Sequence, residues 1–201
     1  MFDHSVSQRI APWVNRLARQ AKRLGLTANQ LTLLGFLLGL VAACLIAFEA
    51  YGPGAIAIGL SRLLDALDGA VARMTKATDA GGFLDIALDF VFYASIPLAF
   101  AFSNPARNAL PAAVLLAAFI GTGSSFLAFA VMAAKRNMHN LNMPNKSFYF
   151  LGGLTEATET LACFILMCLW PAYFIELAYG FAALCAITTA TRIWWGWRAF
   201  Q

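Results

Sequence analysis

The chain has 201 residues, of which 61% are hydrophobic and 12% are charged, and its mean hydropathy is +0.70. A soluble domain of this length needs a far larger polar surface, so the composition excludes an ordinary soluble protein and indicates a protein embedded in a membrane. The formal net charge is +4, yet we find no aromatic-basic motif for binding nucleic acid, and none is expected as a partner.

The first 26 residues predict an amphipathic helix that lies in the membrane interface. Apolar residues recur there at helical spacing with arginines between them: Ile10, Trp13, Val14, Leu17, Ala21 and Leu24. A signal peptide is excluded, because the segment lacks an apolar core and its charges continue to Arg23. Basic amphipathic helices of this kind lie along a bilayer surface, although an ordinary solvated helix is the alternative. We therefore divide the chain into an interfacial helix at residues 1–26 and a membrane domain at residues 27–201.

Six apolar blocks follow, each long enough to cross a bilayer with about 20 residues. The predicted spans are Gln30–Phe48, Pro53–Arg73, Gly81–Phe102, Ala109–Ala134, Phe148–Trp170 and Ala172–Ile193. The predicted fold is therefore an all-α integral membrane protein with six transmembrane helices joined by short loops. The cysteines inside these spans lack metal-ligand spacing and are predicted to be packing residues; they are Cys44, Cys163, Cys168 and Cys185.

Basic residues predict the orientation of these spans. They gather before the first span and in alternate loops, at Arg9, Arg16, Arg19, Lys22, Arg23, Arg73, Lys76, Lys135, Arg136, Lys146 and Arg198, whereas the opposite loops carry only Arg107. An excess of Lys and Arg marks cytoplasmic loops, so both termini are predicted to be cytoplasmic. The positive net charge thus fits membrane topology and anionic lipid headgroups.

Four aspartates lie inside or at the mouth of these spans, where ionisable groups mark functional sites by default. Asp65 and Asp68 share one helix face near the end of the second span, and Asp85 and Asp89 share one near the start of the third. A turn near Thr75–Asp79 joins the two spans, so the two pairs should meet at similar depth. Carboxylates this close repel one another in a low dielectric. Hard divalent cations such as Mg²⁺ relieve that repulsion through oxygen ligands, so the sequence predicts a metal site.

Structural ion pairs are the alternative to a metal site. Arg62 and Arg73 are the available cations, but they would account for at most two of the four aspartates. Ion pairs also leave unexplained the small residues around the acids, which are Gly69, Ala70, Ala72, Gly81 and Gly82. Small residues let helices approach closely, and they also let a bulky ligand sit against the backbone.

These residues carry a family resemblance. The stretch Asp65-Ala-Leu-Asp68-Gly-Ala-Val-Ala-Arg73, followed by Gly81-Gly-Phe-Leu-Asp-Ile-Ala-Leu-Asp89, resembles the motif of the CDP-alcohol phosphatidyltransferase family. That motif is D-x-x-D-G-x-x-A-R, a spacer, and G-x-x-x-D-x-x-x-D, and every fixed position is present. The spacer between Arg73 and Gly81 is one residue shorter than the usual form. The resemblance extends over the whole chain.

The resemblance implies a role for each aspartate. Asp65, Asp68 and Asp85 are expected to bind two divalent ions, Mg²⁺ or Mn²⁺, that grip the pyrophosphate of a CDP-linked donor. Asp89 belongs to the same metal site and is expected to be the catalytic base toward the acceptor hydroxyl. The metals neutralise charge on the phosphates and on the departing CMP, while a carboxylate takes the proton of the attacking alcohol.

The resemblance also implies residues that bind the donor. Gly69 and Ala72 are expected to leave room for the cytidine and ribose, and Arg73 either binds phosphate or pairs with an aspartate. Asn29 and Thr32 belong to the Asn29-Gln-Leu-Thr32 stretch that opens the first span, and we include them in the donor site.

The implied function is transfer of the phosphatidyl group of CDP-diacylglycerol to the hydroxyl of a small alcohol, with release of CMP. The expected partners are this donor, the alcohol, membrane lipids and a second copy of the chain. One alternative is a CDP-amino-alcohol phosphotransferase that acts on diacylglycerol. The other is a divalent-cation transporter, which is disfavoured because the sequence shows no repeated halves.

The acceptor side has fewer signals. Basic residues near the cytoplasmic ends of the fourth and fifth spans either hold an acceptor phosphate or serve as positive-inside anchors; they are Lys135, Arg136 and Lys146. Glu156 and Glu159 are predicted to lie inside the fifth span. They either bound the pocket, attract a cationic acceptor group, or form ion pairs with partners such as Arg62 or Arg192. Phe90 follows Asp89 where glycerol-phosphate-using members often have Lys, and the acceptor stays open.

Overall fold

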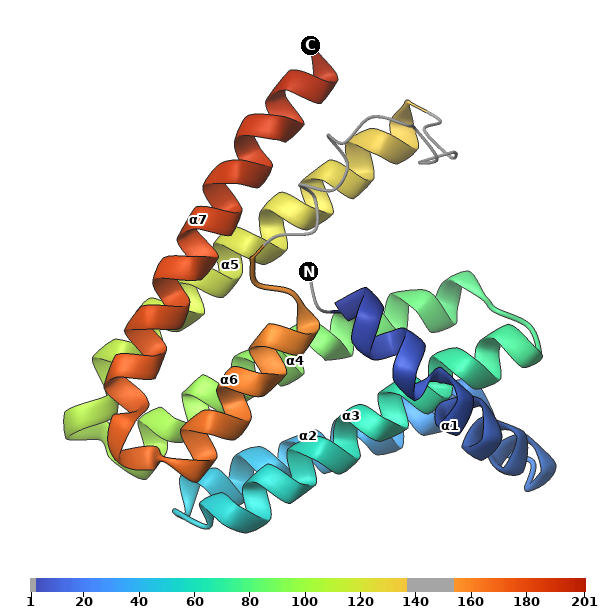
Figure 1. Cartoon of the computed structure of the whole chain (residues 1–201), viewed down its shortest axis with the longest axis horizontal. Helices are drawn as coiled ribbons and strands as arrows, with labels where there is room; N and C mark the ends of the chain where they lie inside the picture. The colour runs from blue at the N-terminus through green and yellow to red at the C-terminus, as the bar shows by residue number, and fades with distance from the viewer. Residues whose placement is uncertain (1–2, 137–153) are drawn as a thin grey trace.

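The protein is described by a computed structural model over residues 3–136 and 154–201, and every regular element in these ranges is a helix (Figure 1). In chain order they are α1 (Asp3–Arg23), α2 (Ala28–Ala47), α3 (Tyr51–Met74), α4 (Asp79–Ser103), α5 (Pro105–Lys135), α6 (Ala157–Leu169), the short 3₁₀ helix η2 (Pro171–Tyr173) and α7 (Phe174–Phe200). The predicted all-α class is confirmed.

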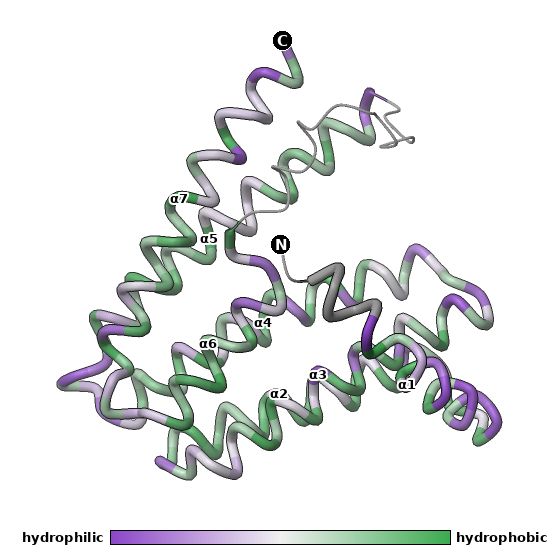
Figure 2. The backbone as a smooth tube through the Cα atoms, viewed as in Figure 1, coloured by the Kyte–Doolittle hydropathy of each residue, from purple (hydrophilic) through white to green (hydrophobic). Residues whose placement is uncertain are grey.

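Among residues 3–136 and 154–201, four helical segments are long and apolar enough to cross a membrane: α2, α4, α5 and α7 together with η2. Large apolar side chains face outward along them, as in α5, where Leu110 is 68% and Ile120 is 72% exposed. Figure 2 shows apolar positions over most of these helices, with hydrophilic ones concentrated toward the helix ends and α1. Exposed apolar surface of this extent marks a face that contacts lipid or another apolar partner. α3 is 24 residues long, but its charged residues make it less apolar than the other four.

The helices form two pairs with a layer between them: α2 and α3 are antiparallel, whereas α5 and α7 run in the same direction. α2 packs against α3, and α5 packs against α7, while α4 contacts both α2 and α5 (Figure 1). An aromatic core joins the layers. Phe100 of α4 stacks on Phe174 of α7 with ring centroids 4.5 Å apart, and Phe92 of α4 meets Phe164 of α6 at 6.4 Å. These four phenylalanines are almost completely buried.

Close packing of α2 against its neighbours depends on glycine. A Cβ atom at Gly39 would lie 2.6 Å from Cδ2 of Phe92, and one at Gly54 would lie 2.8 Å from Cγ1 of Ile46. The Ser61 hydroxyl of α3 donates to the Gly35 carbonyl of α2 at 2.7 Å, in a buried position. Small residues at these crossings bring the backbones together, as they do in membrane helix interfaces generally.

α1 divides the apolar face that the sequence predicted. Its small residues Val14, Ala18 and Ala21 are buried in a cluster with Leu67, Ala70 and Val71 of α3. The remaining predicted apolar residues face outward: Ile10, Trp13, Leu17 and Leu24. Lys22 donates to the Met74 carbonyl at 2.8 Å, which fastens α1 to the end of α3. α1 is therefore an amphipathic helix attached to α3.

The predicted fifth span is wrong in its placement of the two glutamates. Residues 154–156 are not helical, and α6 begins at Ala157. Glu156 is its N-cap and Glu159 its third residue; the Glu156 N–H donates to Oε2 of Glu159 at 3.2 Å in a capping box. Acidic groups are favoured at a helix N-terminus, where free N–H groups and the helix dipole are positive. The expected start at Phe148 lies outside the described residues, and α7 runs past the expected end at Ile193 to Phe200.

The packing at Gly39 yields a test of stability. Gly39→Ala should destabilise the protein by about 1–3 kcal/mol, because fully buried Phe92 has little room to retreat from the new methyl group. Thermal unfolding of the purified protein in detergent checks this. Gly59→Ala in α3 is the matched control, since a Cβ atom there meets nothing within 4 Å. Equal melting temperatures for the two variants would contradict the proposed role of Gly39.

Candidate active site

The turn between α3 and α4 brings the two acidic helix segments together. α3 ends at Met74, and the Thr75 N–H bonds the Ala72 carbonyl at 3.2 Å. Thr78 is the N-cap of α4, and its hydroxyl accepts a hydrogen bond from the Gly81 N–H at 3.1 Å. Threonine is a favoured N-cap because its oxygen satisfies a free N–H of the first turn. The turn expected near Thr75–Asp79 is confirmed, and it reverses the chain so that α3 and α4 both pack against α2.

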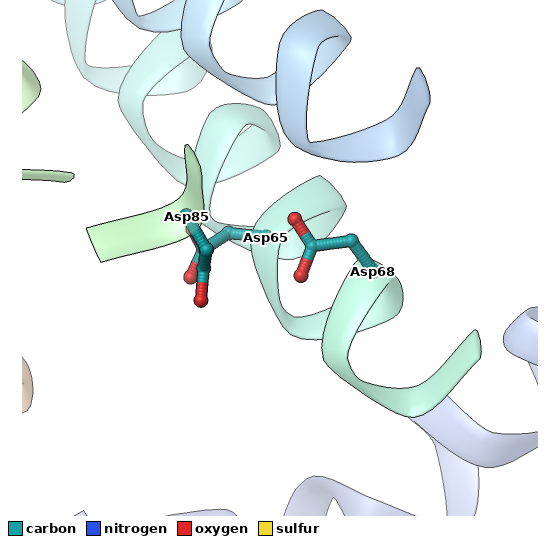
Figure 3. A group of neighbouring side chains, drawn as sticks. All are labelled: Asp65, Asp68 and Asp85. Atoms are coloured by element: carbon teal, nitrogen blue, oxygen red, sulfur yellow. The ribbon is translucent and has the colours of Figure 1, made fainter. Parts of the chain in front are cut away.

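Three aspartates converge at this junction. Asp65 and Asp68 of α3 and Asp85 of α4 can each offer one carboxylate oxygen, and these atoms lie within 4.8 Å of one another. Figure 3 shows the Asp65 and Asp85 carboxylates close together, with the Asp68 carboxylate directed toward them from the next turn of α3. Asp68 is 4% exposed, whereas Asp65 and Asp85 are partly buried. The prediction that acids from both helices lie close together is confirmed for Asp65, Asp68 and Asp85.

This donor set fits a divalent metal ion. Oδ2 of Asp68 is buried and has no hydrogen-bond partner among residues 3–136 and 154–201. Leaving a buried polar atom unsatisfied costs about 1–3 kcal/mol, and more for a charged group, so a cation at this point would supply the missing interaction. Oxygen-only ligands of this kind suit hard ions such as Mg²⁺ and Mn²⁺.

Asp89 is linked to the group through Arg62. Nη1 of Arg62 donates to Oδ1 of Asp89 at 2.5 Å and lies 3.3 Å from Oδ1 of Asp65. Asp89 is not among the three acids whose oxygens lie within 4.8 Å. The ion pairs weighed as the alternative to a metal are therefore present for two of the four aspartates, alongside the cluster. The position of Arg62 three residues before Asp65 puts both on one helix face, whereas its bond to Asp89 depends on how α4 is placed relative to α3.

The expected donor-binding residues surround the acids unevenly. Among the described residues outside its own turn, a Cβ atom at Gly69 would contact the Arg73 guanidinium alone, at 3.3 Å, so the backbone is accessible there. One at Gly81 would lie 3.0 Å from Oδ1 of Asn29, which places Asn29 against the start of α4. Thr32 donates its hydroxyl to the Ala28 carbonyl at 3.0 Å.

Thr32 and Ala72 complete this set. Thr32 is buried, and its side chain lies near enough to Asp68 to interact with it. Ala72 is partly buried on α3, one turn beyond Asp68. The start of α2 therefore lies next to the acidic half of α3.

The expected acceptor residues lie on other helices. Arg136 donates to the Phe200 carbonyl at the end of α7 and lies 5.3 Å from the Phe200 ring centre, so it caps that helix. Lys135 ends α5, and Lys146 lies outside the described residues. Arg192 interacts electrostatically with Glu156 and donates to the Thr122 carbonyl at 3.1 Å. Of the two expected partners of Glu156, the structure thus favours Arg192.

Two proteins of related sequence and one solved structure of similar fold are described first. Over 197 residues the chain is 51% identical to the inner membrane protein YnjF of Escherichia coli (strain K12), a match that covers 98% of this chain and 96% of that protein. Archaetidylinositol phosphate synthase of Pyrococcus horikoshii is 40% identical over 84 residues, which are 41% of this chain and 45% of that enzyme. The fold is similar to that of Mycobacterium tuberculosis phosphatidylinositol phosphate synthase with CDP-DAG bound, at a TM-score of 0.66, 22% identity, and coverage of 92% and 93%.

A second structure of the mycobacterial synthase, in complex with manganese and citrate, gives a TM-score of 0.67 at 22% identity over 92% of this chain and 88% of that one. The profile of the CDP-alcohol phosphatidyltransferase family matches residues 25–196, which include all four aspartates. The chain therefore belongs to the CDP-alcohol phosphatidyltransferase family and is an integral membrane enzyme of phospholipid synthesis.

Proposed function

We propose that the protein transfers the phosphatidyl group of CDP-diacylglycerol to the hydroxyl group of a small alcohol and releases CMP. The observation that carries the proposal is the group of three aspartate oxygens within 4.8 Å at the α3–α4 junction, with Asp68 Oδ2 unpartnered among the described residues. The accessible backbone at Gly69 lies directly after Asp68. A pyrophosphate-linked nucleotide suits such a place, because divalent ions bind carboxylates and substrate phosphates together.

Asp65, Asp68 and Asp85 are the residues that would hold the metal, in our proposal two ions of Mg²⁺ or Mn²⁺. When bound, the ions would neutralise negative charge on the pyrophosphate and on the departing CMP. The manganese in the mycobacterial synthase structure supports the same class of ion. A divalent cation bound between the carboxylates of α3 and α4 would also offset their mutual repulsion.

Asp89 is the proposed base. Its carboxylate is held on α4 one turn beyond Asp85 and is bonded to Arg62 rather than grouped with the other three. A carboxylate outside the metal ligands is free to accept the proton of the attacking hydroxyl. Gly69 and Ala72 would leave space for the cytidine and ribose, and Asn29, Thr32 and Arg73 are proposed to bind the donor around them.

We propose six membrane crossings in a domain at residues 27–201, with residues 1–26 in the interface. α3 is about 36 Å long at 1.5 Å per residue, which is enough to cross. α6 alone measures only about 20 Å on the same basis, and the first residues of the predicted fifth span, Phe148–Trp170, lie outside the described ranges. The outward-facing Trp13, 67% exposed on basic α1, supports contact with headgroups. The basic residues support cytoplasmic termini and a cytoplasmic active site.

A homodimer is the proposed assembly. α5 presents outward-facing apolar side chains along its length, including Leu110, Ile120 and Val131. A second copy would cover part of this face, and lipid would cover the rest.

The first prediction concerns metal and donor. Excess EDTA should abolish the release of radiolabelled CMP from CDP-diacylglycerol, and added Mg²⁺ or Mn²⁺ should restore it, because the acids need the ions to hold the pyrophosphate. The assay is run over inositol phosphate, glycerol phosphate, serine and phosphatidylglycerol as acceptors. Its control is CDP-choline or CDP-ethanolamine with diacylglycerol. Full activity in EDTA would refute the metal site, and release from the control donor alone would favour the CDP-amino-alcohol phosphotransferase.

The second prediction separates the base from the ligands. Asp89→Asn keeps the shape of the site but removes the proton acceptor, so single-turnover rate should fall by about 10²–10⁴-fold while the donor still binds. Asp68→Asn should weaken donor binding together with turnover, and high metal concentration should rescue part of the loss. Donor affinity and single-turnover rate are measured for both variants. An equal loss of donor affinity in the two would make Asp89 a ligand.

A further inference from the structure

Arg62 carries the further inference, which rests on the proposed function. We propose that Arg62 is a positioning residue with two opposed effects. Its guanidinium holds Asp89 in place for proton transfer, and it competes with the metal for Asp65. Removing it should therefore strengthen metal binding and slow turnover at the same time.

The first observation is that one nitrogen atom links the two acidic helices. Nη1 of Arg62 lies 2.5 Å from Oδ1 of Asp89 on α4 and 3.3 Å from Oδ1 of Asp65 on its own helix. Asp65 is also one of the three acids that can hold a metal. The positive charge of Arg62 beside the Asp65 carboxylate opposes the approach of a divalent cation. The same guanidinium gives the Asp89 carboxylate a hydrogen-bond partner.

The second observation is that the guanidinium is clamped. Its carbon lies 4.0 Å from the ring centre of Phe92 and 6.0 Å from that of Tyr93. Nη2 donates to Oγ of Ser61 at 3.3 Å, and that hydroxyl donates to the Gly35 carbonyl at 2.7 Å. Only 11% of the Arg62 side chain is exposed. Because Phe92 is itself fully buried, the carboxylate of Asp89 is bonded to a group with little freedom to move.

The third observation is that stability alone does not account for Arg62. Its Nε is buried without a hydrogen-bond partner in the part of the chain that the structure describes. Burying a charge with an unsatisfied donor is costly. The side chains of Asp65 and Asp89 are 31% and 32% exposed, so water can solvate their carboxylates when Arg62 is replaced. Arg62→Met therefore removes the charge and the bond to Asp89 at a smaller cost than breaking a fully buried ion pair.

Arginine also suits the position better than lysine. A planar guanidinium can stack on a ring and reach two carboxylates at once, whereas an ammonium acts as a flexible point charge. Arg62→Lys should keep the competing charge but lose the fixed geometry. It therefore separates the electrostatic effect on the metal from the positioning of Asp89.

The test measures Mn²⁺ affinity by electron paramagnetic resonance and CMP release by single turnover, both on the full chain in lipid nanodiscs. Arg62→Met should bind Mn²⁺ roughly tenfold tighter, as expected when one nearby positive charge is removed, and should turn over about 10²-fold more slowly. Arg62→Lys should bind Mn²⁺ about as weakly as the unsubstituted chain and recover part of the rate. Weaker Mn²⁺ binding in Arg62→Met, in step with its rate, would show a merely structural residue and overturn the proposal.

A double-mutant cycle tests whether Arg62 acts through Asp89. In the Asp89→Asn background, Arg62→Met should cause no further loss of rate, since the positioned group has gone, but it should still tighten Mn²⁺ binding. A further loss as large as in the unsubstituted chain would overturn the positioning role. If Arg62→Met does not fold, the same cycle is measured with Arg62→Lys, alone and combined with Asp89→Asn. If Arg62 acts by positioning Asp89, Arg62→Lys should slow turnover in the unsubstituted chain but not in the Asp89→Asn background.

The two proposals fail in different ways. Absence of CMP release from every CDP-linked donor in the unsubstituted chain would refute the proposed function, while Mn²⁺ affinity would still report the competition at Asp65. Release of CMP combined with unchanged Mn²⁺ affinity in Arg62→Met would refute the competition and leave the proposed function standing.

Discussion

Repulsion among carboxylates at the α3–α4 junction is the constraint on which the rest of this structure depends. Asp65, Asp68 and Asp85 bring negative charge together in a partly buried place, where water screens it poorly. Arg62 offsets part of that charge by pairing with Asp65 and Asp89. The remaining negative charge lies on Asp68 and Asp85, and it is the reason that we propose a divalent cation at this junction in addition to the ion pairs.

The surrounding fold holds this charged junction together from the apolar side. Phe92 lies beneath the Arg62 guanidinium and also belongs to the aromatic core that connects α4 to α6. Gly39 lets α2 come close to that ring, and Ser61 ties α3 to α2 through the Gly35 carbonyl. The same contacts that pack the bundle therefore set the position of the guanidinium, and through it that of Asp89. Core packing and site geometry are not separable here.

The three clustered aspartates and Asp89 occupy different surroundings, which fits their separate proposed roles as metal ligands and as base. The carboxylate oxygens come from both α3 and α4, so they meet only when both helices are packed against α2. The accessible backbone at Gly69 adjoins the buried acid Asp68, with the Arg73 guanidinium beside it, and this is where we propose that the nucleotide binds. Asp89 is kept apart by its bond to Arg62. A carboxylate already engaged by metal would be a poorer proton acceptor, so this separation favours its proposed role.

Much of the architecture and the three-aspartate group followed from the sequence. Bilayer-length apolar runs require no knowledge of the fold. The i, i+3 and i, i+4 spacings place Asp65 with Asp68 and Asp85 with Asp89 on shared helix faces, and the short capped turn between the helices predicts that the pairs come near each other. Other features depended on how the helices rotate and pack. The start of α6 at Ala157 was missed because hydropathy cannot distinguish a capping glutamate from one inside a span.

Tertiary structure alone decided three further points. It divided the α1 apolar face between α3 and the exterior, placed Glu156 near enough to Arg192 to interact electrostatically, and directed Arg62 to Asp89 on α4. The partner of a side chain across a helix interface depends on rotation, crossing and depth, which no residue spacing within a single helix encodes. The sequence by itself therefore determined the membrane class and the acidic motif, because both are local. The partner of the proposed base was decided by packing, because Arg62 and Asp89 meet only once α3 and α4 are both packed against α2.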